Sequence, residues 1–323
     1  MPLSSDIQEF IKCFGSSWTS SVNRACELFF ELCHASLPEV PSRPPIRHDK
    51  DVKYGPHERH RLDIFYSSVA TANEPRALPV VVFFHGGGFK IGDNAITPHM
   101  HANIGRFLAV NGMVGVLGTY RLLPEARFPD GMEDIARALR WLREKARLYG
   151  GDPKSIFVLG HSAGGAHVAM ALFSGLLRQG HNHVPRGIMF LSTAIAYDLT
   201  KEPRRSDMEL YYNTRDHKKI EALSGLGMLR RLPCNVAESE ERHQTNLPEL
   251  FIALADYDFT ECVRGNLNFV EELTLQRGRM PRFEVWHGHN HVSYVLSIGL
   301  PGDETGPMIV EWVGECLSGP ERQ

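Results

Sequence analysis

A serine placed to act as a nucleophile lies within residues 160–164, which have the form G-x-S-x-G with Ser162 at the centre. The segment follows a short apolar run, residues 155–159, and precedes a helix-like stretch from Ala163 to Leu177. A serine at such a strand-to-helix turn is held in a strained conformation, with its hydroxyl above the sheet edge. The flanking glycines let strand and helix approach closely, because a Cβ at either position would clash. The pattern predicts acyl transfer by Ser162.

A glycine-rich loop upstream is suited to binding the charge that forms in such a reaction. Gly86, Gly87 and Gly88 follow the apolar run of residues 79–84, of which 80–82 are β-branched. Consecutive glycines can present backbone N–H groups to a substrate oxygen without an intervening side chain. Loss of one donor aimed at a tetrahedral oxyanion costs about 3–4 kcal/mol. We therefore expect an oxyanion hole made by these three glycines and by the N–H of Ala163, the residue after the nucleophile.

A carboxylate and a histidine follow two later strands. Residues 250–254 form a buried apolar run, with Asp258 shortly after it, and residues 282–286 form the next strand-like run, with His291 after it. The chain order Ser162, Asp258, His291 is the order that this type of nucleophile turn requires. The carboxyl ends of parallel strands meet at one edge of a sheet, where open α/β sheets bind their ligands. We expect these three side chains to form a catalytic triad.

With these motifs the chain resembles α/β-hydrolases of the hormone-sensitive-lipase-like superfamily. Within it, the chain is most similar to the branch of small carboxylesterases, feruloyl-esterase-like proteins and kynurenine formamidases. The resemblance implies an α/β fold in which a mostly parallel sheet is flanked by helices, with small helical cap elements. It covers roughly residues 50–318 and is carried by residues 51–55 with 62–66, 85–89, 120–125, 151–165, and the region of Asp258 and His291.

Each of the two later triad positions has a rival close by. Asp256 stands two residues before Asp258, and His289 stands two residues before His291. The family pattern favours Asp258 as the acid and His291 as the base. In that arrangement His291 takes the proton from Ser162, and Asp258 holds the imidazole tautomer and stabilises the imidazolium.

The resemblance implies hydrolysis of small to medium carboxylic esters through an acyl-enzyme, with no cofactor. Two other enzymatic readings stay open. One is an arylformamidase that cleaves an N-formylkynurenine-type formamide with the same triad, and the other is a pathway-specific hydrolase or cyclase of specialised metabolism. A receptor or scaffold on a hydrolase fold is disfavoured, because such proteins usually lose the serine or the histidine and both are present here.

The resemblance implies a small-molecule ester or amide as the partner, and the composition argues against nucleic acid and membrane partners. The net charge is −3, and no run of lysine or arginine is long enough to bind a phosphate backbone, so nucleic acid is not expected. The sequence contains no stretch of 18 consecutive apolar residues, so no membrane span is predicted. The acidic N-terminal residues do not resemble a secretory signal, so a cytoplasmic location is expected. A homodimer is left open.

Cysteine and histidine positions suggest neither a disulfide framework nor a metal site. In a long cytosolic chain, cysteines are mostly reduced. His287, His289 and His291 alternate, but no carboxylate or thiol set completes a tetrahedral metal site, and the same holds for His181 and His183. We therefore expect no bound metal. The six cysteines are Cys13, Cys26, Cys33, Cys234, Cys262 and Cys316.

Several other polar residues are predicted to have structural roles and no part in the chemistry. His57 and His60 are three residues apart, not the four that a metalloprotease helix requires. His85 is expected to hold the glycine-rich loop, not to take part in chemistry. Tyr120 and Arg121 follow a strand, and we expect Arg121 to anchor a loop by ion pairing.

The domain organisation is predicted to be one α/β-hydrolase domain over residues 1–323. Residues 1–45 have helical periodicity and then a proline-rich end, which suggests an N-terminal helical cap segment. Residues 197–248 are charged and turn-rich and fall between strands, which suggests a cap or lid insertion. The clearest helix is predicted over residues 131–149, and its alternation with strands implies a largely parallel sheet.

Overall fold

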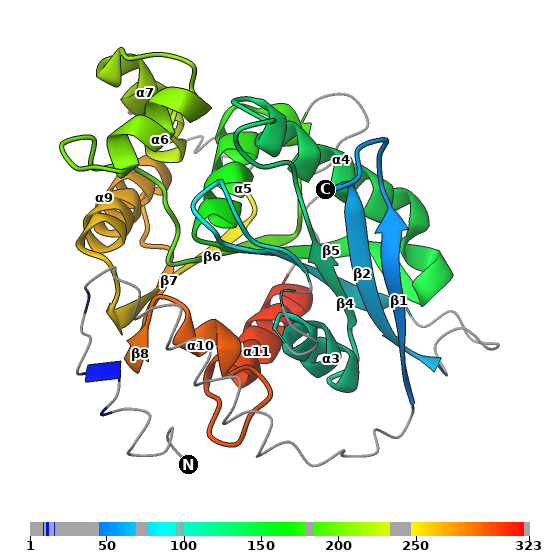
Figure 1. Ribbon diagram of the computed structural model, residues 1–323. Coiled ribbons are helices and arrows are strands. Elements are labelled where there is room, and N and C mark those ends of the chain that lie inside the picture. The colour runs from blue at the N-terminus through cyan, green and yellow to red at the C-terminus, as the bar shows by residue number, and fades with distance from the viewer. Residues whose placement is uncertain are drawn as a thin grey trace, which may run out of the picture.

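The computed structural model describes residues 9, 11–12, 16, 45–68, 77–94, 96, 100–178, 184–232 and 247–319 (Figure 1). Eight strands form a single sheet. The strands are β1 (Ile46–Lys53), β2 (Arg61–Ser67), β3 (Leu78–Phe84), β4 (Val114–Gly118), β5 (Gly151–His161), β6 (Gly187–Leu191), β7 (Glu249–Tyr257) and β8 (Arg282–Asn290).

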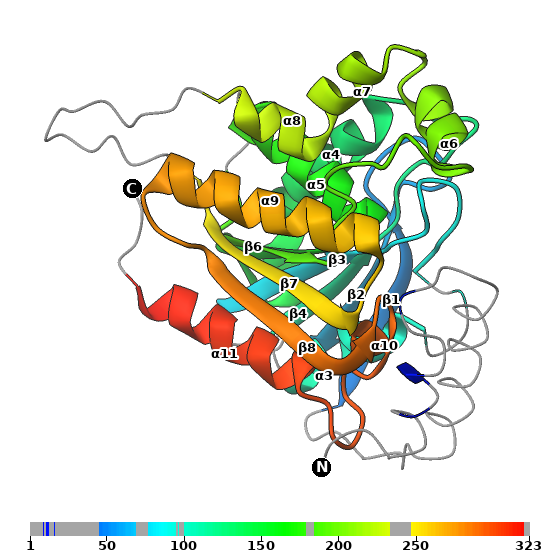
Figure 2. The ribbon, with the colours of Figure 1, turned by 90° about the vertical axis from the view of Figure 1, so that its left-hand side faces the viewer.

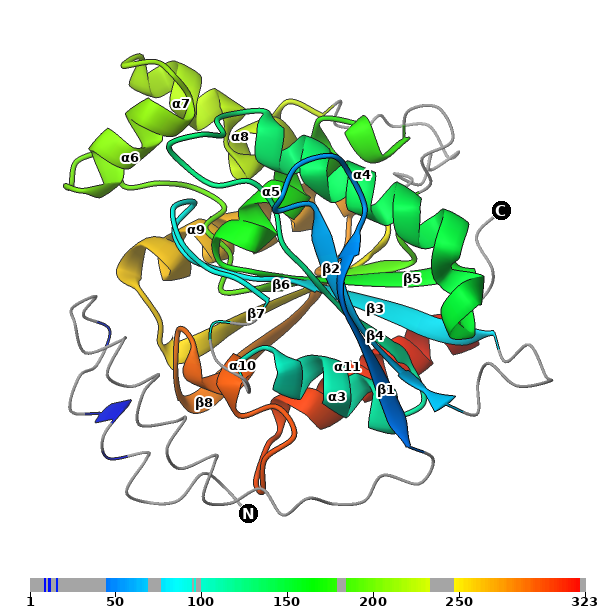
Figure 3. The ribbon, with the colours of Figure 1, turned by 45° about the vertical axis from the view of Figure 1, so that its right-hand side comes forward.

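The sheet is mostly parallel, as the sequence predicts. Its strand order is β1-β2-β4-β3-β5-β6-β7-β8. The β1–β2 and β2–β4 pairs are antiparallel, and every pair from β4 to β8 is parallel. The β1–β2 hairpin therefore forms one edge and β8 the other (Figure 3). The carboxyl ends of β3, β5, β7 and β8 meet at one edge of the sheet, where the predicted site residues follow them.

Helices cover both faces of the sheet. Figure 2 shows α4, α5, α8 and α9 on one face and α3, α10 and α11 on the other. The α-helices are α3 (Ala102–Val110), α4 (Asp130–Lys145), α5 (Ala163–Phe173), α6 (Arg204–Tyr211), α7 (His217–Leu223), α8 (Gly225–Arg230), α9 (Thr260–Arg277), α10 (Ser293–Leu296) and α11 (Thr305–Ser318). Short 3-10 turns span Ala146–Tyr149 and Leu176–Arg178.

Two hydrophobic cores follow from the alternation of side chains along the central strands. In β3, Val80 and Val82 belong to the core under α4, α5 and α9, whereas Val81 and Phe83 belong to the core under α3 and α11. Successive side chains of a strand point to opposite faces of the sheet. A strand that is buried on both faces is therefore apolar at every position. This explains why the apolar run at residues 79–84 marks a central strand.

The turn between β5 and α5 is as tight as the glycine pattern predicts. A Cβ built on Gly160 would lie 2.7 Å from the Cα of Gly165. A Cβ on Gly164 would lie 2.4 Å from the carbonyl oxygen of Phe84. Between them, Ser162 has φ 50° and ψ −117°, a positive φ that residues other than glycine rarely adopt. The packed glycines on both sides hold the serine in this conformation.

The predicted elements match the observed ones, with three corrections at their ends. Residues 131–149 form α4 and a 3-10 turn, as expected. The helix predicted to reach Leu177 ends at Phe173, because Gly175 adopts φ 81°. Strand β7 continues to Tyr257, and β8 continues to Asn290, since these two residues pair across the ladder. Asp256 therefore lies inside a strand instead of beyond its end.

Some predictions concern residues that lie mostly outside the described ones. The N-terminal segment 1–45 is described only at residues 9, 11, 12, 16 and 45. Residues 197–232 contain α6, α7 and α8, and 233–246 lie outside. His181 and His183 also lie outside, as do the other four cysteines: Cys13, Cys26, Cys33 and Cys234. Of the two described cysteines, Cys262 is a buried free thiol and Cys316 is partly buried. Among the described helices, none has the length and apolar character needed to cross a membrane.

The elbow geometry gives a paired stability prediction. Gly164→Ala should destabilise the protein by about 1–3 kcal/mol, because the added Cβ would meet the fixed backbone of Phe84 and His85. Gly314→Ala is the matched control, since α11 leaves open space around Gly314 and alanine favours helix by about 0.5–1 kcal/mol. Urea unfolding of both variants measures the difference. Equal stability of the two variants would show that the start of α5 is not in tight contact with the end of β3.

Candidate active site

Ser162, His291 and Asp258 lie in one continuous line of hydrogen bonds. The Oγ of Ser162 is 2.9 Å from Nε2 of His291, and Nδ1 of His291 is 2.7 Å from Oδ1 of Asp258. Ser162 has an exposed fraction of 9%, whereas His291 and Asp258 are 2% exposed. The serine is therefore the member that meets solvent. The ring of Phe259 lies 4.4 Å from that of His291 and covers it.

Asp258 is held as a carboxylate by donors on both oxygens. Oδ1 accepts from the N–H of Phe259 at 2.9 Å, in addition to His291. Oδ2 accepts from the hydroxyl of Ser192 and from the N–H of Ala255 at 3.3 Å. Burial favours a raised pKa, but the charge of His291 and the hydrogen bonds from His291, Ser192 and Ala255 outweigh it and lower the pKa of Asp258.

The two rival residues lie elsewhere. Asp256 pairs through Oδ1 with Nδ1 of His287 at 3.0 Å, and its Oδ2 accepts from the N–H of Gly288 at 2.8 Å. Nδ1 of His289 is 3.0 Å from the hydroxyl of Ser293. Asp256 thus belongs to an exposed pair on the β7–β8 ladder, and His289, near the end of β8, contacts the first residue of α10. Neither shares a hydrogen bond with Ser162 in the described structure.

Of the three predicted glycines, Gly86 lies beside the nucleophile. A Cβ built on Gly86 would lie 3.0 Å from the Cβ of Ser162, so this backbone packs against the serine. Gly87 and Gly88 have φ of 129° and 60°, and the space around Gly88 is open. Ala163 is the first residue of α5, where N–H groups have no intrahelical acceptor.

Three side chains fix the glycine loop, residues 85–89. The Tyr120 hydroxyl donates to the carbonyl of His85 at 2.6 Å, and the two rings stack with centroids 4.6 Å apart. Arg59 donates from Nε to the Tyr120 carbonyl at 2.7 Å and from Nη2 to the Gly92 carbonyl at 2.8 Å. Burial lowers the pKa of His85 to about 3, so its ring is neutral. The structural role expected for His85 is confirmed, whereas the sequence did not reveal that of Arg59.

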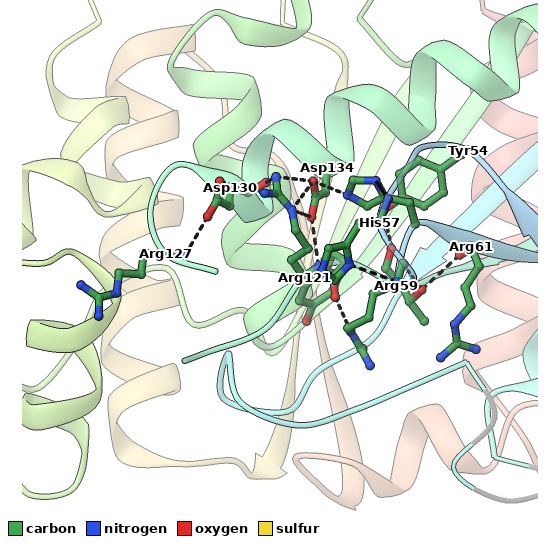
Figure 4. Close-up of polar contacts among 11 residues, drawn as sticks. Tyr54, His57, Arg59, Arg61, Arg121, Arg127, Asp130 and Asp134 are labelled. Carbon is green, nitrogen blue, oxygen red and sulfur yellow. Dashed lines mark hydrogen bonds and ion pairs between the residues drawn. The ribbon is translucent and has the colours of Figure 1, made fainter. Parts of the chain in front are cut away.

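The loop anchor predicted at Arg121 is also confirmed. Its guanidinium contacts Asp134 at 2.7 Å and Asp130 at 3.0 Å, which ties the loop after β4 to α4 (Figure 4). His60 Nε2 lies 2.9 Å from Oδ1 of Asp134, the oxygen that Arg121 Nη2 also contacts. The buried Asp134 is therefore shared by a guanidinium and an imidazole, which gives His60 a structural partner.

One group of potential metal ligands occurs among the described residues. Donor atoms of Asp258, Cys262 and His291 lie within 4.8 Å of one another. The His291 nitrogen that faces Asp258 is already hydrogen-bonded to it. Burial raises the pKa of the Cys262 thiol well above its usual value, which disfavours the thiolate that a metal requires. The group therefore fits an acid–base pair better than a metal centre.

The chain matches a family model and is similar to proteins named as esterases. A family model described as alpha/beta hydrolase fold matches residues 81–295. The chain is 31% identical over 227 residues to the esterase LipI of Mycobacterium tuberculosis, which covers 69% of this chain and 68% of LipI. It is 45% identical over 89 residues to the carboxylesterase NlhH of the same species, but that match spans only 27% of either chain.

Solved structures share the fold over almost the whole chain. Esterase B from Lactobacillus rhamnosis superposes with a TM-score of 0.70 at 16% identity, covering 97% of this chain and 96% of that one. An esterase of the bacterial hormone-sensitive lipase family superposes with a TM-score of 0.61 at 23% identity, covering 98% and 100%. At these identities the likeness concerns the fold.

Buried neutral histidines predict a loss of stability in mild acid. Burial lowers the pKa values of His85, His161 and His167 to about 3. The unfolded chain binds protons at these positions below a pH of about 6.5, whereas the folded protein does not, so stability is full above that pH and falls as the pH drops. Each histidine contributes up to about 1.4 kcal/mol per pH unit.

The free energy of unfolding, measured with urea at constant ionic strength, should therefore be lower at pH 5.5 than at pH 7.5. This window lies above the titration range of ordinary carboxylates. Equal stability at the two pH values would contradict the burial of these histidines as neutral groups.

Proposed function

Since the chain belongs to the alpha/beta hydrolase fold family, we propose that it is a serine hydrolase of the carboxylesterase type, which cleaves small to medium carboxylic esters. One observation carries the proposal: Ser162, His291 and Asp258 are joined by hydrogen bonds of 2.9 and 2.7 Å at the carboxyl edge of the sheet. The similarity to LipI, whose name describes an esterase, supports the reaction class.

In the proposed mechanism, Ser162 attacks the ester carbonyl while Nε2 of His291 takes the hydroxyl proton. Asp258 keeps the His291 proton on Nδ1 and stabilises the imidazolium that forms. The orientation needed for this exchange is already present, because Nδ1 faces the carboxylate and Nε2 faces Oγ. His291 then returns its proton to the leaving alcohol. Water cleaves the acyl-enzyme by the same route.

The negative charge of the tetrahedral intermediate is assigned to the oxyanion hole. We place it against N–H groups of Gly86, Gly87, Gly88 and Ala163. Gly86 packs on the Ser162 Cβ, and Ala163 opens α5, so both groups lie next to the reacting oxygen. The positive end of the α5 dipole also favours negative charge at this place.

We propose that α6, α7 and α8 form a cap attached to the glycine loop. In Figure 1, α6 and α7 lie beyond the sheet, above α9. The Lys90 ammonium, next to the loop, contacts the Asp207 carboxylate of α6 at 2.7 Å. The Phe89 ring packs against Tyr211 of α6 with centroids 4.7 Å apart. These contacts support the insertion predicted at residues 197–248.

The described N-terminal residues support a second cap element. Ile11 is buried against Leu296 of α10, beside Tyr257 and Val292. Tyr257 precedes the proposed acid, and Val292 follows the proposed base. Ile11 therefore lies next to the segments that carry the proposed acid and base. Two covering segments favour soluble substrates of limited size.

Substrate preference tests this proposal. Soluble short-chain p-nitrophenyl esters should be hydrolysed with higher kcat/KM than emulsified long-chain triglycerides, because the caps restrict access from an interface. A parallel assay with N-formylkynurenine tests the arylformamidase alternative. Faster turnover of the formamide than of every ester would reject the carboxylesterase assignment, and stronger activity on emulsions would reject the proposed size limit.

A pair of asparagine variants tests which carboxylate acts. Asp258→Asn should lower kcat on the order of 10³- to 10⁴-fold, because an amide permits the wrong imidazole tautomer. Asp256→Asn should change kcat less than about threefold, since its pair with His287 is exposed and such pairs contribute little. Steady-state kinetics on one soluble ester measures both.

Thermal unfolding of the two variants serves as the control for folding. A severe loss in Asp256→Asn together with near-normal turnover in Asp258→Asn would assign the acid to the other carboxylate and contradict the proposed triad.

A further inference from the structure

A buried chain of hydroxyl groups continues the triad beyond Asp258. The Ser192 hydroxyl donates to Oδ2 of Asp258, on the side of the carboxylate away from His291. The Tyr294 hydroxyl in turn donates to Oγ of Ser192 at 2.8 Å. Ser192 and Tyr294 are each 0% exposed. The two hydroxyls therefore reach the carboxylate without competition from bulk water.

The backbone holds Ser192 in place for this contact. Ser192 follows β6 and has φ 43°, a conformation that is unfavourable for most side chains. Its N–H donates to the Ala253 carbonyl at 2.8 Å, and the Cys262 thiol donates to its carbonyl at 3.6 Å. Strain of this kind persists only where the surroundings impose it, and it is common at functional sites.

Tyr294 is fixed by its aromatic neighbours. Its ring lies against Trp286 of β8, with centroids 6.2 Å apart, and against His161, with centroids 6.1 Å apart. His161 Nε2 contacts the carbonyl of His291 at 2.8 Å. Because α10 begins two residues after His291, the same short segment carries the base and the phenol.

We propose that Ser192 and Tyr294 are positioning residues for the proposed ester hydrolysis. They form a relay that fixes Oδ2 of Asp258 and draws part of its negative charge away from His291. The proposal rests on the proposed function. Neither residue contacts a substrate in this mechanism, and both act through the carboxylate.

The relay should tune the protonation of the base. Donors to a carboxylate reduce the negative potential that it exerts on a neighbouring imidazolium. Removing a donor should therefore favour protonated His291 and move the acid limb of the kcat/KM–pH profile to higher pH.

Three titratable groups that lie beside this pair in the described structure stay neutral in the working range. Burial lowers the pKa of His161, on β5, to about 3. Burial also raises the pKa values of Cys262, on α9, and of Tyr294. A shift of the acid limb in a relay variant can therefore be assigned to the Asp258–His291 pair.

The decisive variant is Tyr294→Phe, which removes one hydroxyl and keeps the ring. We expect kcat on a soluble ester to fall about 3- to 10-fold, as for the loss of one hydrogen bond, with KM nearly unchanged. The acid limb should move upward by a few tenths of a pH unit. Tyr54→Phe is the matched control, because this buried hydroxyl donates to the Thr119 carbonyl, away from the triad.

Ser192→Ala should show the larger effect. It removes a hydrogen bond to a charged group, so we expect kcat to fall about 10- to 100-fold and the acid limb to rise by up to about one pH unit. Alanine keeps a Cβ, so the backbone strain at φ 43° is the same in both proteins. If Ser192→Ala does not fold, Tyr294→Phe still tests the relay.

Proton NMR provides a readout that does not depend on turnover. The proton shared by His291 and Asp258 should resonate far downfield and be absent in Asp258→Asn. It should move in Tyr294→Phe and stay in place in Tyr54→Phe. Inactivity of the wild-type protein toward all esters would contradict the proposed function, while this resonance would still test the relay. An unmoved acid limb and resonance in Tyr294→Phe would overturn the relay, whether or not kcat falls.

Discussion

The close contact between β5 and α5 is the constraint on which the candidate site depends. Gly160 and Gly165 meet so closely that neither can carry a Cβ, and Ser162 is thereby held at a positive φ. This turn sets the direction of the serine hydroxyl. It also exposes the first N–H groups of α5 beside that hydroxyl. The nucleophile and part of its oxyanion hole thus arise from one packing contact.

The second requirement is that buried, uncharged groups surround the pair of Asp258 and His291. Histidines at positions 85, 161 and 167 are buried and uncharged, so the field near the site is dominated by Asp258 and its partner. Asp258 stays ionised because four donors compensate for its burial. In such an environment a fixed carboxylate acts strongly on the adjacent imidazole. The same burial makes the fold sensitive to acid.

The parts that the sequence predicted are local. The elbow, the three glycines and the alternation of strands and helices can each be read within a dozen residues. The contacts of Arg59 with Gly92 and of Ser192 with Asp258 join segments far apart in the chain, and a single sequence carries no signal for them. The ends of β7 and β8 were missed for a related reason. Asp256 and His287 look like loop residues, but pairing between neighbouring strands keeps them in the ladder.

The proposed mechanism depends on Ser162 acting as a nucleophile that His291 activates. Its most direct test is covalent labelling of the wild-type protein with a fluorophosphonate, followed by intact-mass and peptide mass spectrometry. This mechanism predicts one adduct per chain, located on Ser162, with esterase activity lost in proportion to labelling. It also predicts a folded Ser162→Ala protein that neither labels nor turns over ester. Labelling at another residue, or full ester turnover by Ser162→Ala, would contradict the account.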